Sequence, residues 1–418
     1  MKLKTIPLIC ASLAFFASSM ACSAETLSEA LQTGSSIKLN FRTRYENVEW
    51  DGLKDSDALT IRSRLTYQSG AWNGFAGTIE VDNISAVIDQ DYRTWAKDPE
   101  NPGTAIIGDR KGTDLNQSYI SYTVNKDVIK YGRQRIILDN ARFIGNSAWR
   151  QNEQTYDGVS ITDQSLQDTT IFAAHITNVN RGAGNDVPIQ GDYKQDTNLF
   201  NVGYSGFKAG KLSVFAYLIN NLSDPYLVAD AGNNRAAISN NTYGFRWAST
   251  ANPKFTYALV FATQKSAYDN PIDYSADYKF VEVGTKIGVF QPSASYEILG
   301  SDDGKKGFAT PLATLHSFKG WTDRFGTTPV NGLTDLNLSL ASTYWNTQFL
   351  VQHHDFKSDI GSINYGSEWD LSVSKKIGAV VYLAKYAVFD NKGLVERIGT
   401  QNLASDTTKY WLQADWNF

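Results

Sequence analysis

The sequence predicts an all-β protein, a transmembrane antiparallel β-barrel of about eighteen strands. Three observations indicate this fold. Apolar and polar residues alternate with a period of two along most of the chain, the connections are short and long in turn, and the last strand carries its aromatic face to the final residue. Transmembrane barrels combine strands of about ten residues with short periplasmic turns and long extracellular loops. A soluble sandwich has no need of this alternation in loop length.

The first 24 residues have the pattern of a secretory signal peptide, with two lysines before an apolar run and small residues up to Ala24. We expect cleavage after Ala24, which leaves residues 25–418 as a single barrel domain. Acylation of Cys22, as in a lipoprotein, is the alternative interpretation, although the residues before Cys22 lack the aliphatic side chain usual at such sites.

Composition excludes several classes of function. Both cysteines lie in the leader, so the mature chain has no disulfide, no thiolate nucleophile and no Cys-ligated metal. Without the two leader lysines the chain has 37 basic and 43 acidic residues, which argues against a nucleic-acid partner. No run of about 18 apolar residues follows the leader, so no transmembrane helix is expected. We expect no cofactor and no metal, since the acidic segments 51–57 and 301–307 match no known calcium-loop spacing.

Period-two alternation predicts the individual strands. Their expected ranges are 36–50, 57–69, 72–84, 115–124, 127–136, 155–163, 167–178, 195–206, 209–222, 239–250, 252–265, 275–287, 288–299, 332–342, 344–356, 363–375, 378–390 and 406–418. The connections SGAW, NKD, DQSLQ, GFKAG, TANP, TYWN and KIGA are short. Long polar segments lie between them, at 85–114, 137–154, 179–194, 223–238, 300–331 and 391–405. With the amino terminus in the periplasm, every short turn falls on the periplasmic side.

The carboxyl-terminal strand has one apolar face, which we expect to meet lipid. Tyr410, Leu412, Ala414, Trp416 and Phe418 share that face. The opposite face carries Lys409, Gln413, Asp415 and Asn417. Phe418 is expected at the periplasmic interface, where barrels carry a girdle of aromatic residues.

The first three strands predict a charged lumen wall. In SIKLNFRTRYENVEW, one face consists of Ile37, Leu39, Phe41, Thr43 and Tyr45, and the other of Lys38, Asn40, Arg42, Arg44 and Glu46. A charge on the lipid face costs about 2–4 kcal/mol at mid-membrane, so the arginines should face the lumen. The next two strands place Arg62, Arg64, Glu80 and Asp82 inward by the same alternation.

Turn positions suggest how these charges pair. A loop centred near Leu53 would place Arg44 opposite Arg62 and Arg42 opposite Arg64. A turn at residues 70–71 would place Arg62 opposite Glu80. Opposed like charges destabilise a sheet, so water, an acidic neighbour or an anionic solute should screen them. Two interpretations stay open: an ordinary charged wall of a water-filled barrel, or an arginine ladder that selects anions.

Two loop segments are unusually rich in side chains that bind or pack. Residues 130–158 combine arginines with aromatic and amide side chains, and the candidates for solute contact are Arg133, Arg135, Arg142, Trp149 and Arg150. The alternative is a loop that only plugs and braces the barrel wall. Guanidinium groups bind carboxylates bidentately, and aromatic faces stack on sugars or on arginine. Residues 310–325 are too apolar for an exposed loop, so Leu312, Leu315, Phe318 and Trp321 should pack inside the mouth with His316, Lys319 and Arg324.

These two segments, GRQRIILDNARFIGNSAWRQNEQTYDGV and TPLATLHSFKGWTDRF, together with the terminal aromatic strand, resemble the alginate export family of bacterial outer-membrane proteins. The resemblance spans roughly residues 35–418. It implies a monomeric eighteen-stranded barrel with an arginine-lined constriction, and anionic solutes such as uronate polysaccharide. Arg133, Arg135, Arg142 and Arg150 are the positions that the shared segment marks as pore-lining.

The sequence therefore favours a passive outer-membrane channel for anionic solutes. We expect the chain to be exported through its signal peptide, inserted by the barrel assembly machinery and surrounded by outer-membrane lipid. A non-selective, structural or adhesive barrel is the first alternative. An outer-membrane lipid hydrolase is the second, and it would need a histidine beside a serine on the outward face. Of the four histidines, His353 is expected outward and His354 inward, and no serine is placed beside His353.

Overall fold

In the computed structural model of the chain, the described residues are 26–88, 91–94, 101–184, 187, 191–222, 235–249, 254–392 and 405–418. The expected signal peptide and Cys22 lie outside this part of the chain. The strands are β1 Ser36–Trp50, β2 Ser56–Gln68, β3 Phe75–Ala86, β4 Gly112–Val124, β5 Asp127–Gln134, β6 Thr155–Asp163, β7 Thr169–Asn180, β8 Asp192–Tyr204, β9 Lys211–Ile219, β10 Asn240–Ala248, β11 Phe255–Ser266, β12 Ser275–Thr285, β13 Phe290–Leu299, β14 Leu333–Tyr344, β15 Thr347–Lys357, β16 Asn364–Ile377, β17 Val380–Asp390 and β18 Thr407–Asn417. The helices are α1 Leu27–Gln32 and the 3-10 helices η2 Arg235–Ile238 and η3 Leu315–Ser317.

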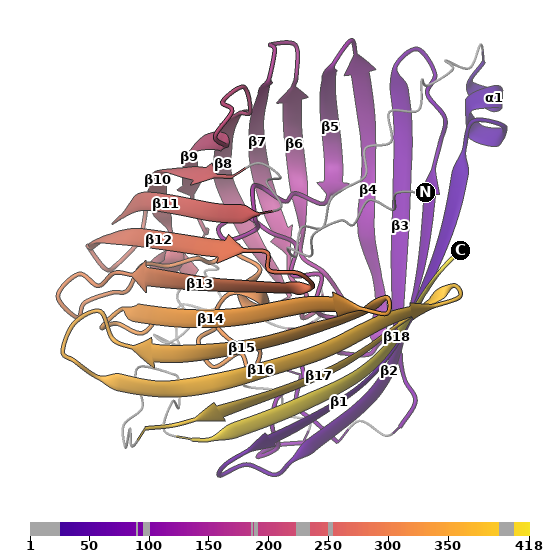
Figure 1. The fold of residues 1–418 in the computed structure, drawn as a ribbon. Helices are drawn as coiled ribbons and strands as arrows, with labels where there is room; N and C mark the ends of the chain where they lie inside the picture. The colour runs from indigo at the N-terminus through magenta and orange to yellow at the C-terminus, as the bar shows by residue number, and fades with distance from the viewer. Residues whose placement is uncertain are drawn as a thin grey trace.

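The eighteen strands close into a barrel (Figure 1). Each strand pairs antiparallel with the next one along the chain, and β18 pairs with β1. Leu39 and Phe418 exchange backbone hydrogen bonds of 3.2 and 2.9 Å at this seam. Closure satisfies the backbone groups that a sheet edge would expose to hydrocarbon. The predicted fold class and all eighteen strands are confirmed, with boundaries that differ by at most three residues.

Connection lengths alternate between the two ends of the barrel, as predicted. At one end the turns are tight: Trp345 and Asn346 alone join β14 to β15, with φ of 48° and 54°, the left-handed backbone of a type I′ hairpin. At the other end most connections are longer, and residues 300–332 form the longest of those described throughout, although the connections 51–55 and 358–363 at that end are short. We name these the periplasmic and extracellular ends, following the usual arrangement of such barrels.

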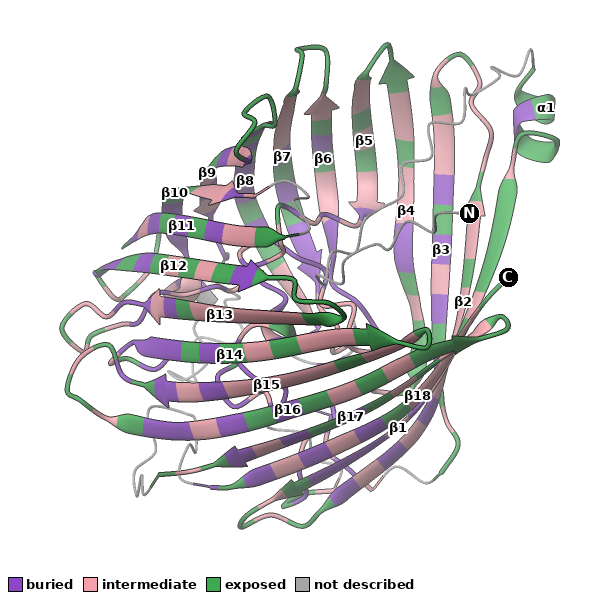
Figure 2. Cartoon of the chain, viewed as in Figure 1, coloured by how far each residue is buried: buried purple, intermediate pink, exposed green. Residues whose placement is uncertain are grey.

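Side chains alternate between the two faces of the wall, and Figure 2 shows this as bands of exposed and buried residues along the strands. On β1, Ile37 is 66 % exposed on the outer face, whereas Arg44 and Glu46 are buried on the inner face. On β18, Leu412 is exposed outward while Trp411 is fully buried inward. The predicted orientation of the lipid and lumen faces of β1 and β18 is therefore confirmed.

The pairing register of the first strands differs from the prediction. Arg42, rather than Arg44, lies opposite Arg62, and Arg44 lies opposite Thr60. The β1–β2 loop is centred at Gly52, with φ of +84°, instead of at Leu53. A shift of the turn centre by one residue moves every cross-strand pair by two, which keeps the faces but changes the partners.

The β2–β3 register was also wrong. Arg64 lies opposite Asp82, and Glu80 lies opposite Thr66 instead of Arg62. The turn is formed by Asn73 and Gly74, both with positive φ, and Trp72 and Phe75 close it with hydrogen bonds of 2.8 and 2.9 Å. Asn-Gly is the preferred pair for a two-residue hairpin turn, so this dipeptide sets the register in place of the Gly70–Ala71 turn that we expected.

Helix α1 was not predicted, and it lies at the periplasmic end of the barrel (Figure 1). Thr26 caps it by accepting a hydrogen bond from the Glu29 amide at 3.1 Å. The Tyr67 hydroxyl donates to the Leu31 carbonyl at 2.9 Å, which anchors the helix to β2. Among the described residues, no helix is both long and apolar enough to cross a bilayer.

Candidate functional site

Two extracellular loops fold into the lumen and bind each other there. We name residues 135–154 the first inner loop and residues 300–332 the second inner loop. Ile144 and Leu312 form a parallel β-bridge between them. The Gly145 amide donates to the Leu312 carbonyl at 2.9 Å, and the Thr314 amide donates to the Ala141 carbonyl at 3.0 Å. The two loops are therefore one connected unit inside the barrel.

Apolar packing holds the second inner loop in place. Leu312 and Trp321 are buried, as predicted, while Leu315 and Phe318 are half-buried. Phe308 and Phe325 are fully buried, and the Phe325 ring lies 4.5 Å from that of Phe356 on β15. These rings contribute apolar burial that fixes the loop against the inner wall.

The arginines of β1 and β2 all lie on the inner face, and each has partners. Arg42 donates to Asp415 at 2.7 Å and to the Ala148 carbonyl at 3.1 Å. Arg62, directly opposite, donates to Asn40 at 2.6 Å and to the Gln151 carbonyl at 3.2 Å. The repulsion expected between opposed arginines is thus offset by a carboxylate and by carbonyl groups of the first inner loop.

Arg44 is fully buried beneath Trp149 of the first inner loop. Its guanidinium carbon lies 4.1 Å from the Trp149 ring centroid, and the guanidinium donates to the Trp149 carbonyl at 2.6 Å. Asp109 lies 3.3 Å away as its counter-ion. Buried in this way, Arg44 positions the loop and has no surface left for a solute.

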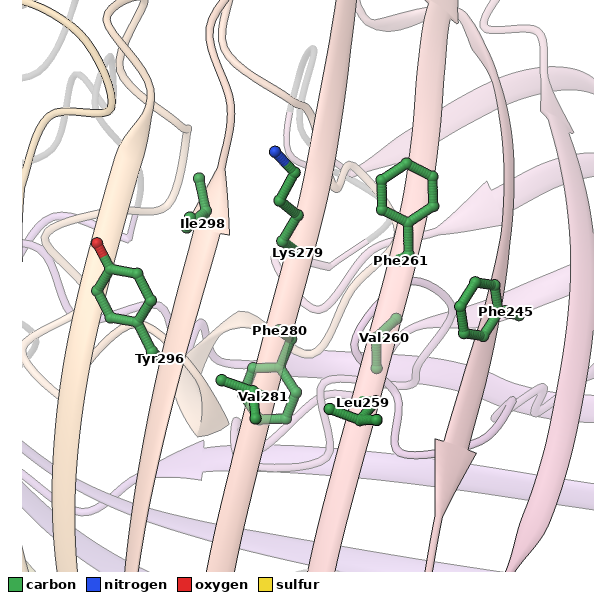
Figure 3. Close-up of a pocket in the computed structure, with 9 residues that line it drawn as sticks. All are labelled: Phe245, Leu259, Val260, Phe261, Lys279, Phe280, Val281, Tyr296 and Ile298. Atoms are coloured by element: carbon green, nitrogen blue, oxygen red, sulfur yellow. The ribbon is translucent and has the colours of Figure 1, made fainter.

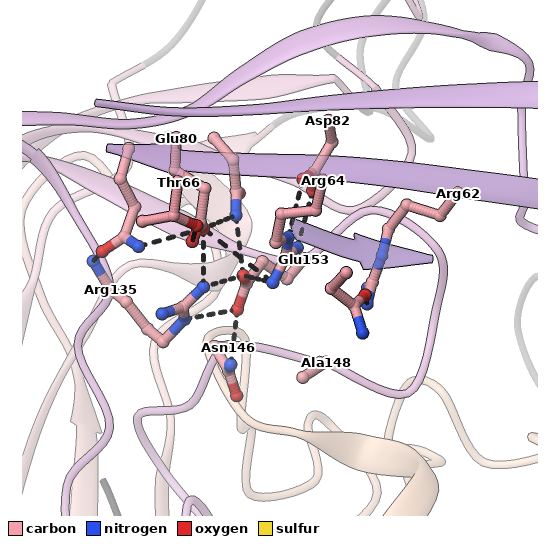
Figure 4. Close-up of polar contacts among 12 residues, drawn as sticks. Arg62, Arg64, Thr66, Glu80, Asp82, Arg135, Asn146, Ala148 and Glu153 are labelled. Carbon is pink, nitrogen blue, oxygen red and sulfur yellow. Dashed lines mark hydrogen bonds and ion pairs between the residues drawn. The ribbon is translucent and has the colours of Figure 1, made fainter. Parts of the chain in front are cut away.

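Glu153 is the centre of a second group of charges (Figure 4). Its carboxylate accepts from Arg64 at 2.9 Å, Arg135 at 2.7 Å, Asn116 at 2.7 Å and Asn146 at 2.6 Å. Burial alone would raise the pKa of Glu153, but the Arg135 and Arg64 guanidinium groups outweigh it and lower the pKa below its usual value. The charged Glu153 carboxylate therefore ties the first inner loop to β2 and β4.

Glu80 and Asp82 complete this group from β3. Glu80 lies 2.9 Å from the Arg135 guanidinium and accepts from Thr66 at 2.6 Å. Asp82 forms a bidentate pair with Arg64, with both contacts at 2.6 Å. Figure 4 shows Arg64, Glu80 and Asp82 converging with Arg135 and Glu153 on one side of the lumen. Bidentate geometry makes such pairs strong and fixes the orientation of the guanidinium plane.

Exposure within these ion pairs is unequal. Arg150 of the first inner loop forms a further lumen ion pair, with Glu46 of β1 at 2.9 Å. Side-chain exposure is 14 % for Arg64, 29 % for Arg135 and 19 % for Arg150. The carboxylates behind them are far less exposed: 1 % for Asp82, Glu153 and Glu46 and 6 % for Glu80. Asp323, a second partner of Arg150, is the exception at 28 %. The accessible layer of this cluster is mainly guanidinium, with the acids beneath it.

Arg142 holds the first inner loop to the opposite wall. Its guanidinium forms a bidentate pair with Glu297 on β13, at 2.6 and 2.9 Å. The Tyr278 hydroxyl also donates to Glu297, at 2.5 Å. Arg142 is 2 % exposed, so it is a structural anchor rather than an accessible contact for a solute.

Trp149 lies in a stack of aromatic and charged groups where the two inner loops meet β17 and β18. The His316 ring stacks on it at 4.5 Å, with an interplanar angle of 3°. The Lys385 ammonium lies 3.8 Å from the Trp149 ring centroid and 3.5 Å from that of Trp321. The Trp411 ring meets Trp149 edge-on at 5.7 Å. Sequence reasoning missed Lys385 and Trp411, although a tryptophan among the polar residues of β18 was a usable signal.

His316 is neutral in this stack. Burial and the nearby Lys385 ammonium lower the pKa of His316 well below its usual value. A neutral imidazole donates from Nδ1 to Asp323, at 2.8 Å, and accepts from Lys385 at Nε2, at 2.7 Å. The ring thus links a loop carboxylate to a wall ammonium.

Arg133 differs from the other predicted candidates in its position. It shares a face of β5 with Ile129 and Tyr131, and Tyr131 is 72 % exposed on the outside of the barrel. Its partner is Asp157 on β6, at 2.8 Å. The pore-lining position expected for Arg133 is therefore wrong, because strand alternation turns its side chain away from the lumen.

The histidines of β15 lie on the two faces expected of them. His353 packs against the outward Trp369, with ring centroids 4.6 Å apart. His354 is buried inside, 2.8 Å from Asp335, and Asn337 also contacts its ring. In the part of the chain that the structure describes, no group of three or more His, Cys, Asp and Glu side chains is arranged to hold a metal ion.

Comparison with known proteins relates the chain to porins by structure alone. No protein-family model matches the sequence, and no curated protein is similar to it at a significant level. The crystal structure of Pseudomonas aeruginosa OpdO is similar with a TM-score of 0.67 and 12 % identity, covering 94 % of this chain and 99 % of that one. Acinetobacter baumannii OccAB4 has a TM-score of 0.66 and 12 % identity, covering 93 % and 98 %. Pseudomonas aeruginosa OpdK with vanillate has a TM-score of 0.65 and 12 % identity, covering 92 % and 99 %.

The resemblance to the alginate export family predicted an eighteen-stranded barrel, and these structures bear out that part. They do not point to the alginate export family itself. At this level of identity the likeness concerns the fold. The chain has the closed, eighteen-stranded antiparallel fold of outer-membrane porins.

Proposed function

We propose that the protein is a passive outer-membrane channel that favours anionic solutes. The observation that carries the proposal is the unequal exposure of the lumen ion pairs, where guanidinium groups of Arg64, Arg135 and Arg150 cover carboxylates that are almost inaccessible. The potential that a solute meets is set mainly by the nearest, least shielded charges. An accessible layer of guanidinium groups therefore attracts anions in spite of the overall acidity of the chain.

Transport by this surface involves no chemical step. A carboxylate can make transient contacts with the exposed parts of the Arg135 and Arg150 guanidinium groups, while Glu153 and Glu46 hold these side chains in place. Because each guanidinium is already paired, its attraction for a passing solute is weakened. Weak contacts that favour entering the lumen without trapping are the requirement for conduction.

Two further considerations favour carboxylate solutes. The resemblance to the alginate export family suggests uronate oligosaccharides or polysaccharides. The structurally similar OpdK was crystallised with vanillate, an aromatic carboxylate. We propose that small carboxylates cross this barrel, with uronates as the first candidates, and that a monomer inserted by the barrel assembly machinery is sufficient.

Single-channel recording with a matched pair of sugars tests this proposal. Galacturonate and galactose differ by one carboxylate, so their effects on the current separate charge from size. We expect galacturonate to interrupt the chloride current at concentrations where galactose has no effect. Equal effects of the two sugars would contradict a guanidinium-based preference.

A structural or adhesive barrel is the second candidate, because the first inner loop bridges the lumen from β1 to β13 through Arg150 and Arg142. Such a barrel would insert into bilayers without passing ions. Absence of conductance in recordings of folded protein would favour this role over a channel.

A further inference from the structure

The outer face of the barrel carries an apolar groove across β10, β11, β12 and β13 (Figure 3). Its volume is about 240 Å³. The outward side chains that line it are Phe245, Leu259, Phe261, Val281, Tyr296 and Ile298, together with Lys279. Pockets for compact drug-sized ligands span about 300–1,000 Å³, so this groove suits part of an extended chain better than a compact molecule.

Lys279 is a cation on a face that should meet hydrocarbon. Its cross-strand neighbours on that face are Phe261 and Ile298, both apolar. Within the residues that the structure describes, no carboxylate lies within ion-pair distance of its ammonium, and the ammonium makes no hydrogen bond. A charge on the lipid face is unfavourable in a depth-dependent way. An unpaired lysine here therefore needs an anion from outside the chain.

The depth of Lys279 in the membrane indicates that this anion comes from the outer leaflet. It lies four residues from Ser275, the extracellular end of β12, which is about 13 Å along the strand at 3.3 Å per residue. Strand tilt reduces this depth, and the long lysine stem can carry the ammonium toward the polar interface. Figure 3 shows the ammonium pointing away from Val281, toward that end of the strands.

Tyr296 adds a second polar group at the same level. It lies opposite Val281 and is therefore a diagonal neighbour of Lys279. Figure 3 shows its hydroxyl directed toward the same end of the strands as the Lys279 ammonium. The groove thus combines an apolar floor with an ammonium and a phenol at its extracellular end.

We propose that this groove binds a membrane lipid whose phosphate headgroup carries a net negative charge. The phosphate pairs with Lys279 and accepts from the Tyr296 hydroxyl, while an acyl chain lies along Phe245, Leu259 and Val281. Phosphate is the anion that membrane lipids supply next to an acyl chain, and a free anion would gain nothing from the apolar floor. This inference goes beyond the channel function and does not depend on it, since the groove lies outside the barrel.

Native mass spectrometry of the full barrel, released from micelles with added lipid, tests the proposal. The probes are dioleoylphosphatidylglycerol, which is anionic, and dioleoylphosphatidylcholine, which has the same chains and no net charge. Wild type should retain phosphatidylglycerol about tenfold better, as expected of one charge-assisted contact. Lys279→Gln should abolish this preference, and Lys279→Arg should keep it. Lys265→Gln is the matched control, since Lys265 lies on the same face of β11 outside the groove and should leave the preference unchanged.

Three results would overturn the proposal. The first is equal retention of the two lipids by wild type, which would make the groove ordinary lipid-facing surface. The second is an unchanged preference in Lys279→Gln protein whose heat-modifiable migration shows a folded barrel. The third is displacement of phosphatidylglycerol by inorganic phosphate at millimolar concentration, which would indicate a site for free anions.

Discussion

Replacing Arg142 by methionine should destabilise the barrel more than the loss of an exposed ion pair. Arg142 and Glu297 expose only 2 % and 5 % of their side chains, and their two contacts measure 2.6 and 2.9 Å. Arg142→Met leaves the Glu297 carboxylate buried, with the Tyr278 hydroxyl among its remaining partners. Removing one partner of a buried pair costs about 3–5 kcal/mol, because the other charge stays buried and uncompensated.

A double-mutant cycle separates this cost from ordinary packing. Arg142→Met combined with Glu297→Leu removes both charges, and replacing a buried pair by apolar residues is often neutral. We therefore expect the double variant to recover most of the lost stability. Lys357→Met is the exposed control, because Lys357 is 54 % exposed beside Asp355 and its pair should contribute about 0–1 kcal/mol.

The assay is urea unfolding of the barrel in lipid vesicles, followed by tryptophan fluorescence, which gives the free energy of unfolding. We expect a large loss of stability for Arg142→Met, a small loss for Lys357→Met and partial recovery in the double variant. If Arg142→Met is no more damaging than Lys357→Met, the pair does not anchor the first inner loop to the wall.

Three further predictions concern the inner loops. A Cβ added at Gly145 would lie 2.3 Å from a hydroxyl oxygen of the second inner loop, so Gly145→Ala should separate the two inner loops and raise the single-channel conductance. Gly326→Ala is the control and should leave the conductance unchanged, because a Cβ at Gly326 meets nothing within 4 Å. Burial lowers the pKa of Lys319 to about 7. Between about pH 7 and 10 the Lys319 side chain is therefore protonated in the unfolded chain and mostly deprotonated in the folded chain. The free energy of unfolding should rise with pH over that range, by at most about 1.4 kcal/mol per pH unit. Lys319→Met should remove that rise in urea unfolding at pH 7 and pH 9, and an equal rise in both proteins would contradict it. Arg135→Gln removes a partly exposed charge, whose attraction for an anion at 4 Å is about 1 kcal/mol in water before screening. The anion-to-cation permeability ratio should therefore fall by a factor of about two to five in bilayer recordings, and an unchanged ratio would exclude Arg135 from the solute path.

Strand positions and faces could be predicted because two solvents meet the wall. Along β1, hydrocarbon on one side and water on the other impose an alternation that the sequence must follow, and Ile37 and Arg44 show it directly. The registers of β1–β2 and β2–β3 were not predicted, because both turn centres were misplaced. Asn73 and Gly74 were the informative pair, and the neighbouring Gly70 was not.

The site itself was only partly predictable. The composition of the inner loops indicated that they pack inside, but nothing local indicates that Ile144 meets Leu312, because that bridge joins segments 168 residues apart. Burial of Arg44 and Arg142 depends on these long-range contacts, so the sequence could not separate anchoring arginines from accessible ones. Glu153 was read only as part of a polar loop, although it is the carboxylate on which Arg135 converges.

The reversal potential of the wild-type channel under a tenfold KCl gradient measures whether the lumen passes anions in preference to cations. Accessible guanidinium groups over buried carboxylates predict a potential displaced toward the chloride equilibrium value. Arg133→Gln, which removes a charge from the outer face, should leave that potential unchanged. A wild-type potential displaced toward the potassium equilibrium value would mean that the lumen favours cations and that these guanidinium groups do not set its selectivity.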